Sequence, residues 1–270
     1  MINILNRLFK KKKKKLGLAL GSGGARGMAH IGVLTAFDEE GIAFDVVAGS
    51  SIGSVVGGMY AAGYSSAAMM RYISEIDIFA AQQIVKTVLS GKTVEDIFAE
   101  ITGGAEFDDL LLPYAAVATD LYNGGQVVIR SGSVAKAMRA SSAVLPMLKP
   151  VELDGKTLID GAYANSVPAD VVKEMGADFV VGVNLSKENP TNEIIKNSLD
   201  AKYPKNGVVL CDRAAPGRNF SDVLLEPDLK NFSVATVTKS GLNKMFEEGY
   251  ETAKAKMPEI KAELKKRKFI

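Results

Sequence analysis

Short apolar runs alternate with helical patterns along the first part of the chain. The run Leu16–Leu20 is followed by a helical pattern from about residue 25 to residue 40, by a second run at Val46–Ala48, and by a helical pattern after Gly53. Apolar runs of this length between helical segments are typical of buried strands. The order strand, helix, strand, helix predicts an α/β fold with a mainly parallel central sheet and helices on both faces.

The rest of the chain continues this alternation with one long interruption. Residues from about 64 to 112 show a helical pattern without strand-like runs, and we expect a helical, lid-like insertion there. Residues 187–218 are rich in proline and are predicted to form a loop-rich surface segment. A helix is predicted from about residue 234 to residue 265, with a break near Pro258 because proline removes a helix hydrogen bond. Five further runs are predicted as strands: Tyr114–Thr119, Gln126–Ile129, Thr157–Ile159, Phe179–Asn184 and Asp222–Leu225.

The composition fits one globular domain. With 270 residues, 47% of them apolar, the chain is long enough for a single α/β unit with a full core, which we place at residues 16–270. Its one cysteine, Cys211, excludes an internal disulfide framework and follows apolar residues, which favours a buried structural thiol. No group of Cys and His residues resembles a set of metal ligands, so we expect neither a bound metal nor disulfides.

Residues 1–15 form a basic arm that differs from the rest of the chain. Arg7 and Lys10–Lys15 supply seven of the 33 basic residues, and the remaining 26 face 31 acidic ones. Ile4, Leu5, Leu8 and Phe9 lie at helical spacing before the lysines, the pattern of an amphipathic anchor beside a polybasic patch. The sequence therefore predicts either contact with an anionic membrane surface through Lys10 to Lys15 or a solvated tail, the commoner use of a charge run.

The chain lacks the signals of export and of membrane insertion. The apolar run after the arm stops at Gly21, which is too short for a signal peptide, and no segment is long enough to span a bilayer. We expect a cytoplasmic protein, with peripheral membrane contact if the arm docks. Nucleic acid is not favoured as a partner, because aromatic residues are not interleaved with either the arm or the second basic cluster, Lys265–Lys268.

A Gly-x-Ser-x-Gly sequence at Gly49–Gly53 lies between a predicted strand and a predicted helix. Such a turn exposes its central side chain at the carboxyl edge of a sheet, so Ser51 is predicted to be a nucleophile. The chain's one histidine, His30, precedes this sequence, whereas an α/β-hydrolase places its histidine base after the nucleophile. A carboxylate must then activate Ser51, and we expect a packing or hydrogen-bonding role for His30.

Two acids follow predicted strands and are candidates for that base. Asp160 follows the run Thr157–Ile159 and precedes Gly161 and Ala162, and Asp120 follows the run Tyr114–Thr119. An Asp-Gly pair also suits an ordinary turn. We interpret Asp160 as the base and Asp120 as structural; partial burial would raise the pKa of Asp160 toward a useful range.

A glycine-rich turn, GSGGARG at residues 21–27, joins the first strand to the first helix. The backbone N–H groups of Gly23 and Gly24, with the positive end of the following helix, can hold a developing oxyanion. We expect Arg26 either to hold this loop in shape or to contact a phosphate group.

The same turn has an alternative interpretation as the nucleotide-binding loop of an NAD(P)-dependent oxidoreductase. Tyr250 and Lys254 have the spacing of a dehydrogenase pair. However, Arg26 occupies the last glycine position of the G-x-G-x-x-G pattern, and the pair lies in a terminal helix far along the chain from the loop.

These blocks together resemble the patatin-like phospholipase family, and most closely its short bacterial members. The resemblance rests on GSGGARG at residues 21–27, GSSIG at 49–53, Asp160–Ala162, and the segment Ala140–Ala143 with Pro146. It runs from about Leu16 to the C-terminal helix. Val144–Met147 and Ser166 depart from the family's usual, more proline-rich sequence, away from the proposed catalytic pair.

The resemblance implies a three-layer sandwich and a lipid acyl hydrolase that uses serine and aspartate without histidine, metal, calcium or organic cofactor. Its substrates would be phospholipids, lysophospholipids or simpler fatty-acyl esters, with the helical region 64–112 either covering an acyl chain or packing as ordinary core. A membrane-associated regulatory or binding module with little turnover remains the alternative. The implied residues are Ser51 and Asp160 as catalytic pair, Gly21, Gly23, Gly24, Ala25, Arg26 and Gly27 as oxyanion loop, Gly49, Ile52 and Gly53 as nucleophile elbow, and Gly161 and Ala162 as aspartate motif.

Overall fold

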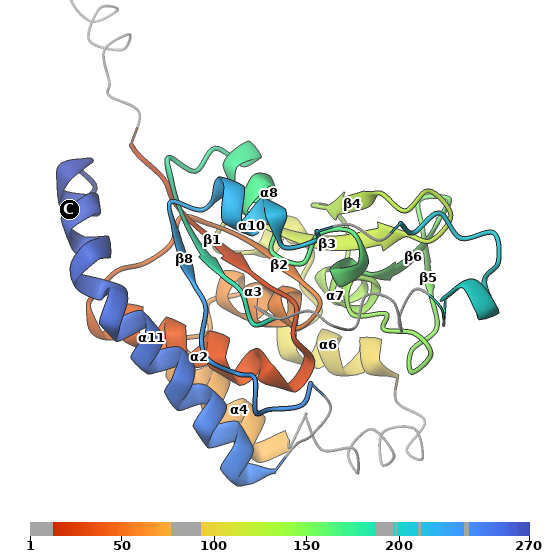
Figure 1. Cartoon of the computed structure of the whole chain (residues 1–270), viewed down its shortest axis with the longest axis horizontal. Helices are drawn as coiled ribbons and strands as arrows, with labels where there is room; N and C mark the ends of the chain where they lie inside the picture. Colours follow the sequence, from red (N-terminus) through yellow and green to blue (C-terminus); the bar gives the residue numbers. More distant parts are fainter. Residues whose placement is uncertain (1–12, 77–92, 187–196, 198, 210–211, 235–237) are drawn as a thin grey trace, which may run out of the picture.

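The computed structural model describes residues 13–76, 93–186, 197, 199–209, 212–234 and 238–270. An eight-stranded sheet runs through the molecule in the order β5-β6-β3-β2-β1-β7-β8, with β4 paired to β3 (Figure 1). Five strands are joined to a neighbour by parallel pairing, and β4, β5 and β6 pair only antiparallel, so the predicted mainly parallel sheet is confirmed. The strands joined by parallel pairing are β1 (Leu16–Leu20), β2 (Val46–Ser50), β3 (Tyr114–Asp120), β7 (Phe179–Val183) and β8 (Val223–Leu225). Of the remaining strands, β5 (Val151–Leu153) runs in the same direction as these five, and β4 (Gln126–Ile129) and β6 (Lys156–Asp160) run in the opposite direction.

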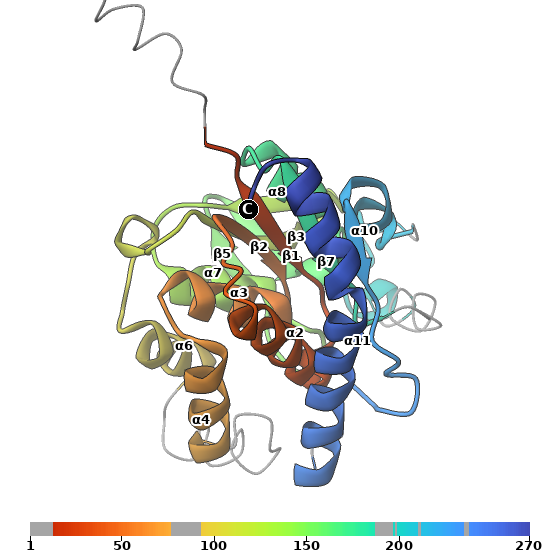
Figure 2. The ribbon, with the colours of Figure 1, turned by 90° about the vertical axis from the view of Figure 1, so that its left-hand side faces the viewer.

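Helices cover both faces of the sheet, as predicted (Figures 1 and 2). The helices that follow β1 and β2, with the C-terminal helix, lie on one face, and α8 and α10 lie on the other. The α-helices are α2 (Met28–Glu39), α3 (Ile52–Ala61), α4 (Ser66–Ile76), α6 (Val94–Thr102), α7 (Val134–Ser141), α8 (Ala169–Glu174), α10 (Ala215–Phe220) and α11 (Lys239–Lys266), and the 3-10 turns are η1 (Gly24–Gly27), η2 (Phe107–Asp109) and η3 (Gly161–Tyr163).

The two faces of β1 show how the strand pattern builds two cores. Leu16, Leu18 and Leu20 point to the larger core under α2 and α11, whereas Ala19 belongs to a smaller core with residues of α8. Small residues on the α8 side let the helix approach closely. A Cβ on Gly17 would lie 2.3 Å from Val172 Cγ1, so the glycine is required for this packing.

The predicted helix break at Pro258 is wrong, because α11 continues through this residue to Lys266. The helix lies along α2 (Figure 2), and Met257 and Ile260 on either side of the proline are buried. Each buried side chain of this size contributes about 1.5–3 kcal/mol. Burial over the length of α11 can therefore offset the roughly 3 kcal/mol that an interior proline costs.

The predicted helical insertion lies partly outside the described residues. In the region 64–112 the described part contains α4, α6 and η2 and no strand, and residues 77–92 are not described. Residues 1–12 of the basic arm also lie outside, while Lys13–Lys15 lead into β1. The helix α10, which the sequence pattern did not predict, begins within the loop-rich stretch 187–218 and ends at Phe220.

Candidate active site

The sheet topology brings Ser51 and Asp160 together. Ser50, the last residue of β2, pairs with Val117 of β3, and Asp160, the last residue of β6, pairs with Ala118. β4 pairs with Ala116–Thr119 of β3, and this stretch overlaps both the residues that pair with β2 and those that pair with β6. Because a strand has only two edges, β2 and β6 lie on the same edge of β3, opposite β4. Their carboxyl ends therefore meet head to head. Ser51 Oγ donates a hydrogen bond to Asp160 Oδ2 over 2.6 Å.

The turn around Ser51 requires its glycines. Ser51 has a positive φ of 55° with ψ of −126°, a conformation that non-glycine residues seldom adopt. A Cβ on Gly49 would lie 2.1 Å from Gly53 O, and a Cβ on Gly53 would lie 2.1 Å from Leu20 O. The strained residue is thus held between β2 and α3 by backbone contacts that leave no room for side chains.

Both carboxylate oxygens of Asp160 accept hydrogen bonds that fix its orientation. Its Oδ2 accepts from Ser51, and its Oδ1 accepts the backbone N–H of Ala162 over 2.8 Å. The residue is 1% exposed. Burial raises the pKa of Asp160 from 3.8 to about 6, while the hydrogen bonds from Ser51 and Ala162 act in the opposite direction. A buried carboxylate of this kind is a stronger base than an exposed one and is still ionised at neutral pH.

Gly161 permits the close approach of the aspartate turn to the nucleophile turn. A Cβ at this position would lie 2.0 Å from Val117 O and 2.6 Å from Ser50 Oγ. The glycine next to Asp160 is therefore needed to seat the turn against β2 and β3.

The glycine-rich loop lies beside this pair and uses part of its hydrogen-bonding capacity internally. The N–H groups of Gly21, Ala25 and Arg26 donate to Val183 O, Val234 O and Gly23 O, respectively. Within the described part of the chain, no backbone hydrogen bond uses the N–H groups of Gly23 and Gly24. Gly23 and Gly24 are therefore candidate donors to an oxyanion, whereas the N–H groups of Gly21, Ala25 and Arg26 are already used.

Two glycines couple the loop to its neighbours. Gly24 has φ of 56°, and a Cβ there would lie 2.5 Å from Val234 O. A Cβ on Gly27 would lie 2.2 Å from the side chain of Ile52, the residue after the nucleophile. The loop and the nucleophile turn therefore pack directly against each other.

Arg26 holds the loop in shape. Its Nε donates to Phe232 O over 2.9 Å, and its Nη1 donates to Leu185 O over 3.1 Å. These bonds tie the loop to the segment before α11 and to the end of β7, which is the structural role that the sequence analysis considered for this residue.

His30 forms a hydrogen bond to the first residue of the same loop. Its Nε2 lies 2.7 Å from Gly21 O, and because a carbonyl only accepts, the ring must donate through Nε2. The side chain is fully buried, and burial lowers the pKa of His30 to about 4. A neutral histidine with this partner is a structural residue, in line with the role expected from its position in the chain.

Ser141 is a site residue that sequence reasoning did not single out. Its Oγ accepts the backbone N–H of Ser51 over 2.9 Å and donates to Val117 O over 2.6 Å. The segment Ala140–Ala143 was noted as a resemblance, but its sequence alone gives no indication of which hydroxyl faces the nucleophile. Ser141 thus connects the strained Ser51 backbone to β3.

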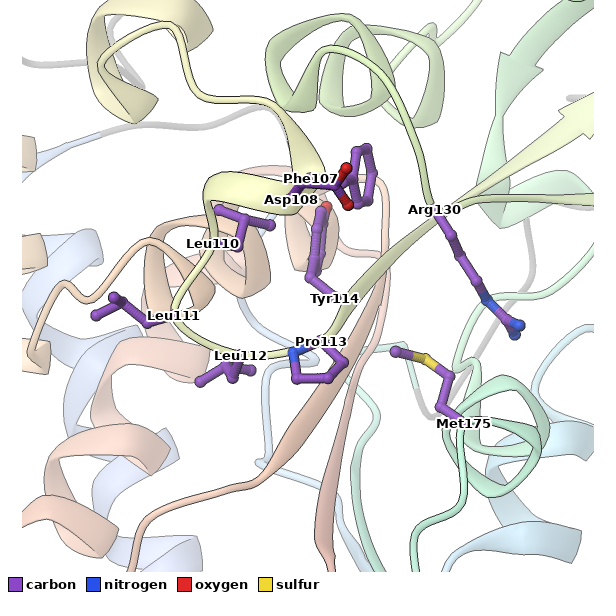
Figure 3. A pocket seen from close by; sticks show the side chains of 9 residues that line it. All are labelled: Phe107, Asp108, Leu110, Leu111, Leu112, Pro113, Tyr114, Arg130 and Met175. Carbon is purple, nitrogen blue, oxygen red and sulfur yellow. The ribbon is translucent and has the colours of Figure 1, made fainter.

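The described pocket lies away from this pair. It encloses about 470 Å³ and includes Phe107, Pro113 and Tyr114 at the amino end of β3, with Arg130 and Met175 opposite (Figure 3). Ser51 and Asp160 lie near the carboxyl ends of the parallel strands, where ligands of such sheets bind. We therefore take Ser51 and Asp160, and not this pocket, as the candidate active site.

The Tyr250–Lys254 pair lies away from the site. Tyr250 and Lys254 both bond to Glu39 at the end of α2, on the outer side of the molecule. Among the described residues, no group of three or more His, Cys, Asp or Glu side chains could hold a metal ion. Asp120 accepts the N–H groups of Tyr122 and Asn123 in its own turn, which is the structural role assigned to it.

Comparison with known proteins places this arrangement in a family. A patatin-like phospholipase family model matches residues 18–173, which include both Ser51 and Asp160. An uncharacterized NTE family protein of Mycobacterium tuberculosis is 37% identical over 182 residues, covering 64% of this chain and 49% of that protein. The human patatin-like phospholipase domain-containing protein 6 is 33% identical over 189 residues, covering 66% of this chain and 14% of that protein. The chain thus spans about half the length of the mycobacterial relative and a small part of the human one.

Solved structures share the fold at low sequence identity. VipD from Legionella pneumophila gives a TM-score of 0.59 at 13% identity, covering 90% of this chain and 66% of that one. The type III effector protein ExoU gives 0.51 at 14% identity, covering 92% of this chain and 53% of that one. With the family match over more than half of its length, the chain belongs to the patatin-like phospholipase family.

Proposed function

We propose that the protein is a serine acyl hydrolase of lipid esters that works with a Ser51-Asp160 dyad through an acyl-enzyme intermediate. The observation that carries this proposal is the 2.6 Å hydrogen bond from Ser51 Oγ to Asp160 Oδ2, made by a nucleophile in a strained turn and a buried carboxylate. Family membership supports a lipid ester as the substrate class.

In the acylation step, Asp160 Oδ2 accepts the proton of Ser51 as Ser51 Oγ attacks the carbonyl carbon of the ester. The negative charge that develops on the carbonyl oxygen is met by the Gly23 and Gly24 N–H groups. The C–O bond to the alcohol then breaks, and the alcohol leaves with the proton from Asp160. Ser51 is left as an acyl ester.

Deacylation repeats the sequence with water. Asp160 takes a proton from a water molecule, the resulting hydroxide attacks the acyl carbon, and Ser51 leaves with that proton. The fatty acid is released and the free dyad is restored. This route uses no metal or organic cofactor.

Two further features of the proposal concern the lipid. The helical region 64–112 would cover the acyl chain, and the basic residues Lys10 to Lys15 would bring the protein to an anionic membrane. Lys13–Lys15 lie at the amino end of β1, beside the end of α11, where Lys14 Nζ donates to Arg267 O (Figure 2). Among the described residues, no helix is both long enough and apolar enough to cross a bilayer.

The experiment that tests this function measures hydrolysis of nitrophenyl acyl esters over a range of chain lengths, with a chelator present. Wild type is compared with Ser51→Ala, Asp160→Asn and Ser50→Ala. Ser50 is the matched control, because its buried hydroxyl has no hydrogen-bond partner in the described structure. We expect activity in wild type and Ser50→Ala and near-complete loss in the other two.

A covalent probe identifies the intermediate independently of turnover. A fluorophosphonate should label the peptide that contains Ser51 in wild type and leave Ser51→Ala unlabelled. Release of fatty acid from phospholipid and lysophospholipid then defines the substrate. A well-folded wild type that neither hydrolyses esters nor reacts with the probe would overturn the proposal in favour of a binding or regulatory module.

A further inference from the structure

A buried arginine outside the recognised motifs holds the turn that follows the catalytic aspartate. Arg213 lies two residues before the start of α10 and is 7% exposed. Its Nη1 donates to Ala162 O over 2.7 Å. Its own carbonyl accepts the N–H of Ser166 over 2.8 Å. One residue thus contacts both ends of the segment 162–166.

Ala162 links Arg213 to the catalytic carboxylate through two hydrogen bonds. The carbonyl of Ala162 accepts from Arg213, and the N–H of the same residue donates to Asp160 Oδ1 over 2.8 Å. Asp160 in turn forms the N-cap of the 3-10 turn η3. A change at Arg213 should therefore move the amide that orients the carboxylate of Asp160.

Charge adds to this geometry. An ionised carboxylate that is 1% exposed needs compensation from hydrogen bonds or a nearby cation. The positive charge of Arg213 lowers the pKa of Asp160 and so opposes the effect of burial. Tyr163 is a further titratable group that interacts with Asp160 and Arg213, and burial raises its pKa to about 12, so it stays neutral.

We propose that Arg213 is a positioning residue that keeps Asp160 oriented and ionised for proton transfer from Ser51. The proposal rests on the proposed Ser51-Asp160 mechanism. It assigns a role in the reaction to the loop-rich stretch 187–218, in which the sequence analysis recognised no function.

The first test is the pH dependence of ester hydrolysis in Arg213→Gln, Arg213→Lys and Arg218→Gln. Arg218 is the matched control, because it lies in α10 with a side chain that is 46% exposed and an ion pair to Asp212. We expect the acid limb of the kcat/KM profile to move up by about one pH unit in Arg213→Gln. Arg213→Lys should keep the limb near its wild-type position, and Arg218→Gln should change nothing. An unshifted limb in Arg213→Gln would overturn the proposal.

The second test needs no turnover, so it separates failure of this inference from failure of the proposed function. Urea unfolding midpoints are measured at pH 8 and pH 5 for Arg213→Gln, alone and combined with Asp160→Asn. We expect Arg213→Gln to lower the urea midpoint more at pH 8, where Asp160 is ionised, than at pH 5. In the double variant, the effect of Arg213→Gln on the midpoint should be the same at both pH values. If Arg213→Gln alone does not fold, the double variant should.

Each result of the second test has a definite meaning. A loss that is equal at both pH values, or that Asp160→Asn does not alter, would contradict the proposed coupling. If the coupling is found in a protein that lacks Ser51-dependent activity, the proposed function fails while Arg213 still supports the ionised aspartate.

Discussion

His30 Nε2 donates a hydrogen bond to Gly21 O over 2.7 Å, and this contact defines what the chain's one histidine does. Gly21 begins the glycine-rich loop, so His30 holds the base of the proposed oxyanion site. Its ring is fully buried, and no hydrogen bond joins it to Ser51 or Asp160 in the described structure. This arrangement supports the proposal that the carboxylate of Asp160, and not the histidine, activates Ser51.

The first prediction concerns activity after substitution of His30. A glutamine amide can also donate to Gly21 O, so His30→Gln should retain most of the ester hydrolysis of wild type. His30→Ala leaves that buried carbonyl without a donor and should lower the free energy of unfolding by about 1–3 kcal/mol. Steady-state kinetics and urea unfolding check both. Near-complete loss of kcat in a folded His30→Gln would contradict the dyad.

The second prediction uses the pKa of His30 to predict stability in acid. The pKa of His30 is lowered from 6.5 to about 4 in the folded protein, so the unfolded chain binds the proton more tightly. Stability from this group is complete above pH 6.5 and is lost as the pH falls toward 4. In wild type, His30 should lower the free energy of unfolding by about 3 kcal/mol as the pH falls over this range, and His30→Gln should abolish this contribution. Unfolding curves at pH 7 and pH 4 should show a smaller acid loss in the variant than in wild type.

The third prediction is that Asp160→Asn stabilises the fold while it removes activity. The folded pKa of Asp160 is about 6 against an ordinary value of 3.8, so its ionised form is disfavoured by folding. The cost is absent below pH 3.8 and complete above pH 6. Asp160→Asn should raise the free energy of unfolding at pH 8 by about 1–3 kcal/mol, and this gain should vanish toward pH 4.

A second buried acid provides the control for this experiment. Asp120 accepts hydrogen bonds from the backbone N–H groups of Tyr122 and Asn123 and plays no part in the proposed reaction. Asp120→Asn should therefore lower stability at pH 8. A loss of stability in Asp160→Asn at the same pH would show that the carboxylate does not carry the burial cost inferred for it.

The elements next to Ser51 and the fate of His30 were accessible from the sequence, because each depends on local order along the chain. β1, its glycine turn, α2, β2 and the Gly49–Gly53 turn follow one another in chain order. The place of β6 was not accessible. Its pairing to β3 head to head with β2 is a long-range contact that no local pattern encodes.

The residues that support Ser51 and the glycine-rich loop could not be identified from the sequence for the same reason. The loss of Ala25 as an oxyanion donor comes from Val234, more than 200 residues along the chain, whose carbonyl takes its N–H. Ser141 and Ser142 are equivalent in sequence, and only the fold shows that Ser141 Oγ meets the Ser51 amide. Pro258 was misread because helix propensity was weighed without the burial that α11 gains against α2.

The fourth prediction tests Ser141 as a support for the nucleophile. Ser141→Ala removes the acceptor of the Ser51 N–H and the donor to Val117 O, both of which are buried. Because small displacements of a catalytic group can cost about 10²-fold in rate, we expect kcat to fall by about 10-fold to 100-fold with KM little changed.

Ser142→Ala is the matched control, since the Ser142 hydroxyl is buried without a hydrogen-bond partner in the described structure. It should retain wild-type kcat. Fluorophosphonate labelling rates, which depend on the Ser51 nucleophile and not on release of product, should fall in Ser141→Ala alone. Equal effects of the two substitutions would assign Ser141 to packing.

The last prediction separates membrane contact from chemistry. Replacing Lys10–Lys15 by glutamine should sharply reduce sedimentation with anionic vesicles, since each lysine near such a surface contributes about 1 kcal/mol. Hydrolysis of a soluble ester should not change, because β1 separates Lys15 at its amino end from the site at its carboxyl end. The control carries the same change of charge at six exposed lysines elsewhere: Lys149, Lys156, Lys202, Lys205, Lys239 and Lys244. It should still sediment with the vesicles. Equal loss in both variants would mean that net charge, and not the arm, attracts the protein to the membrane.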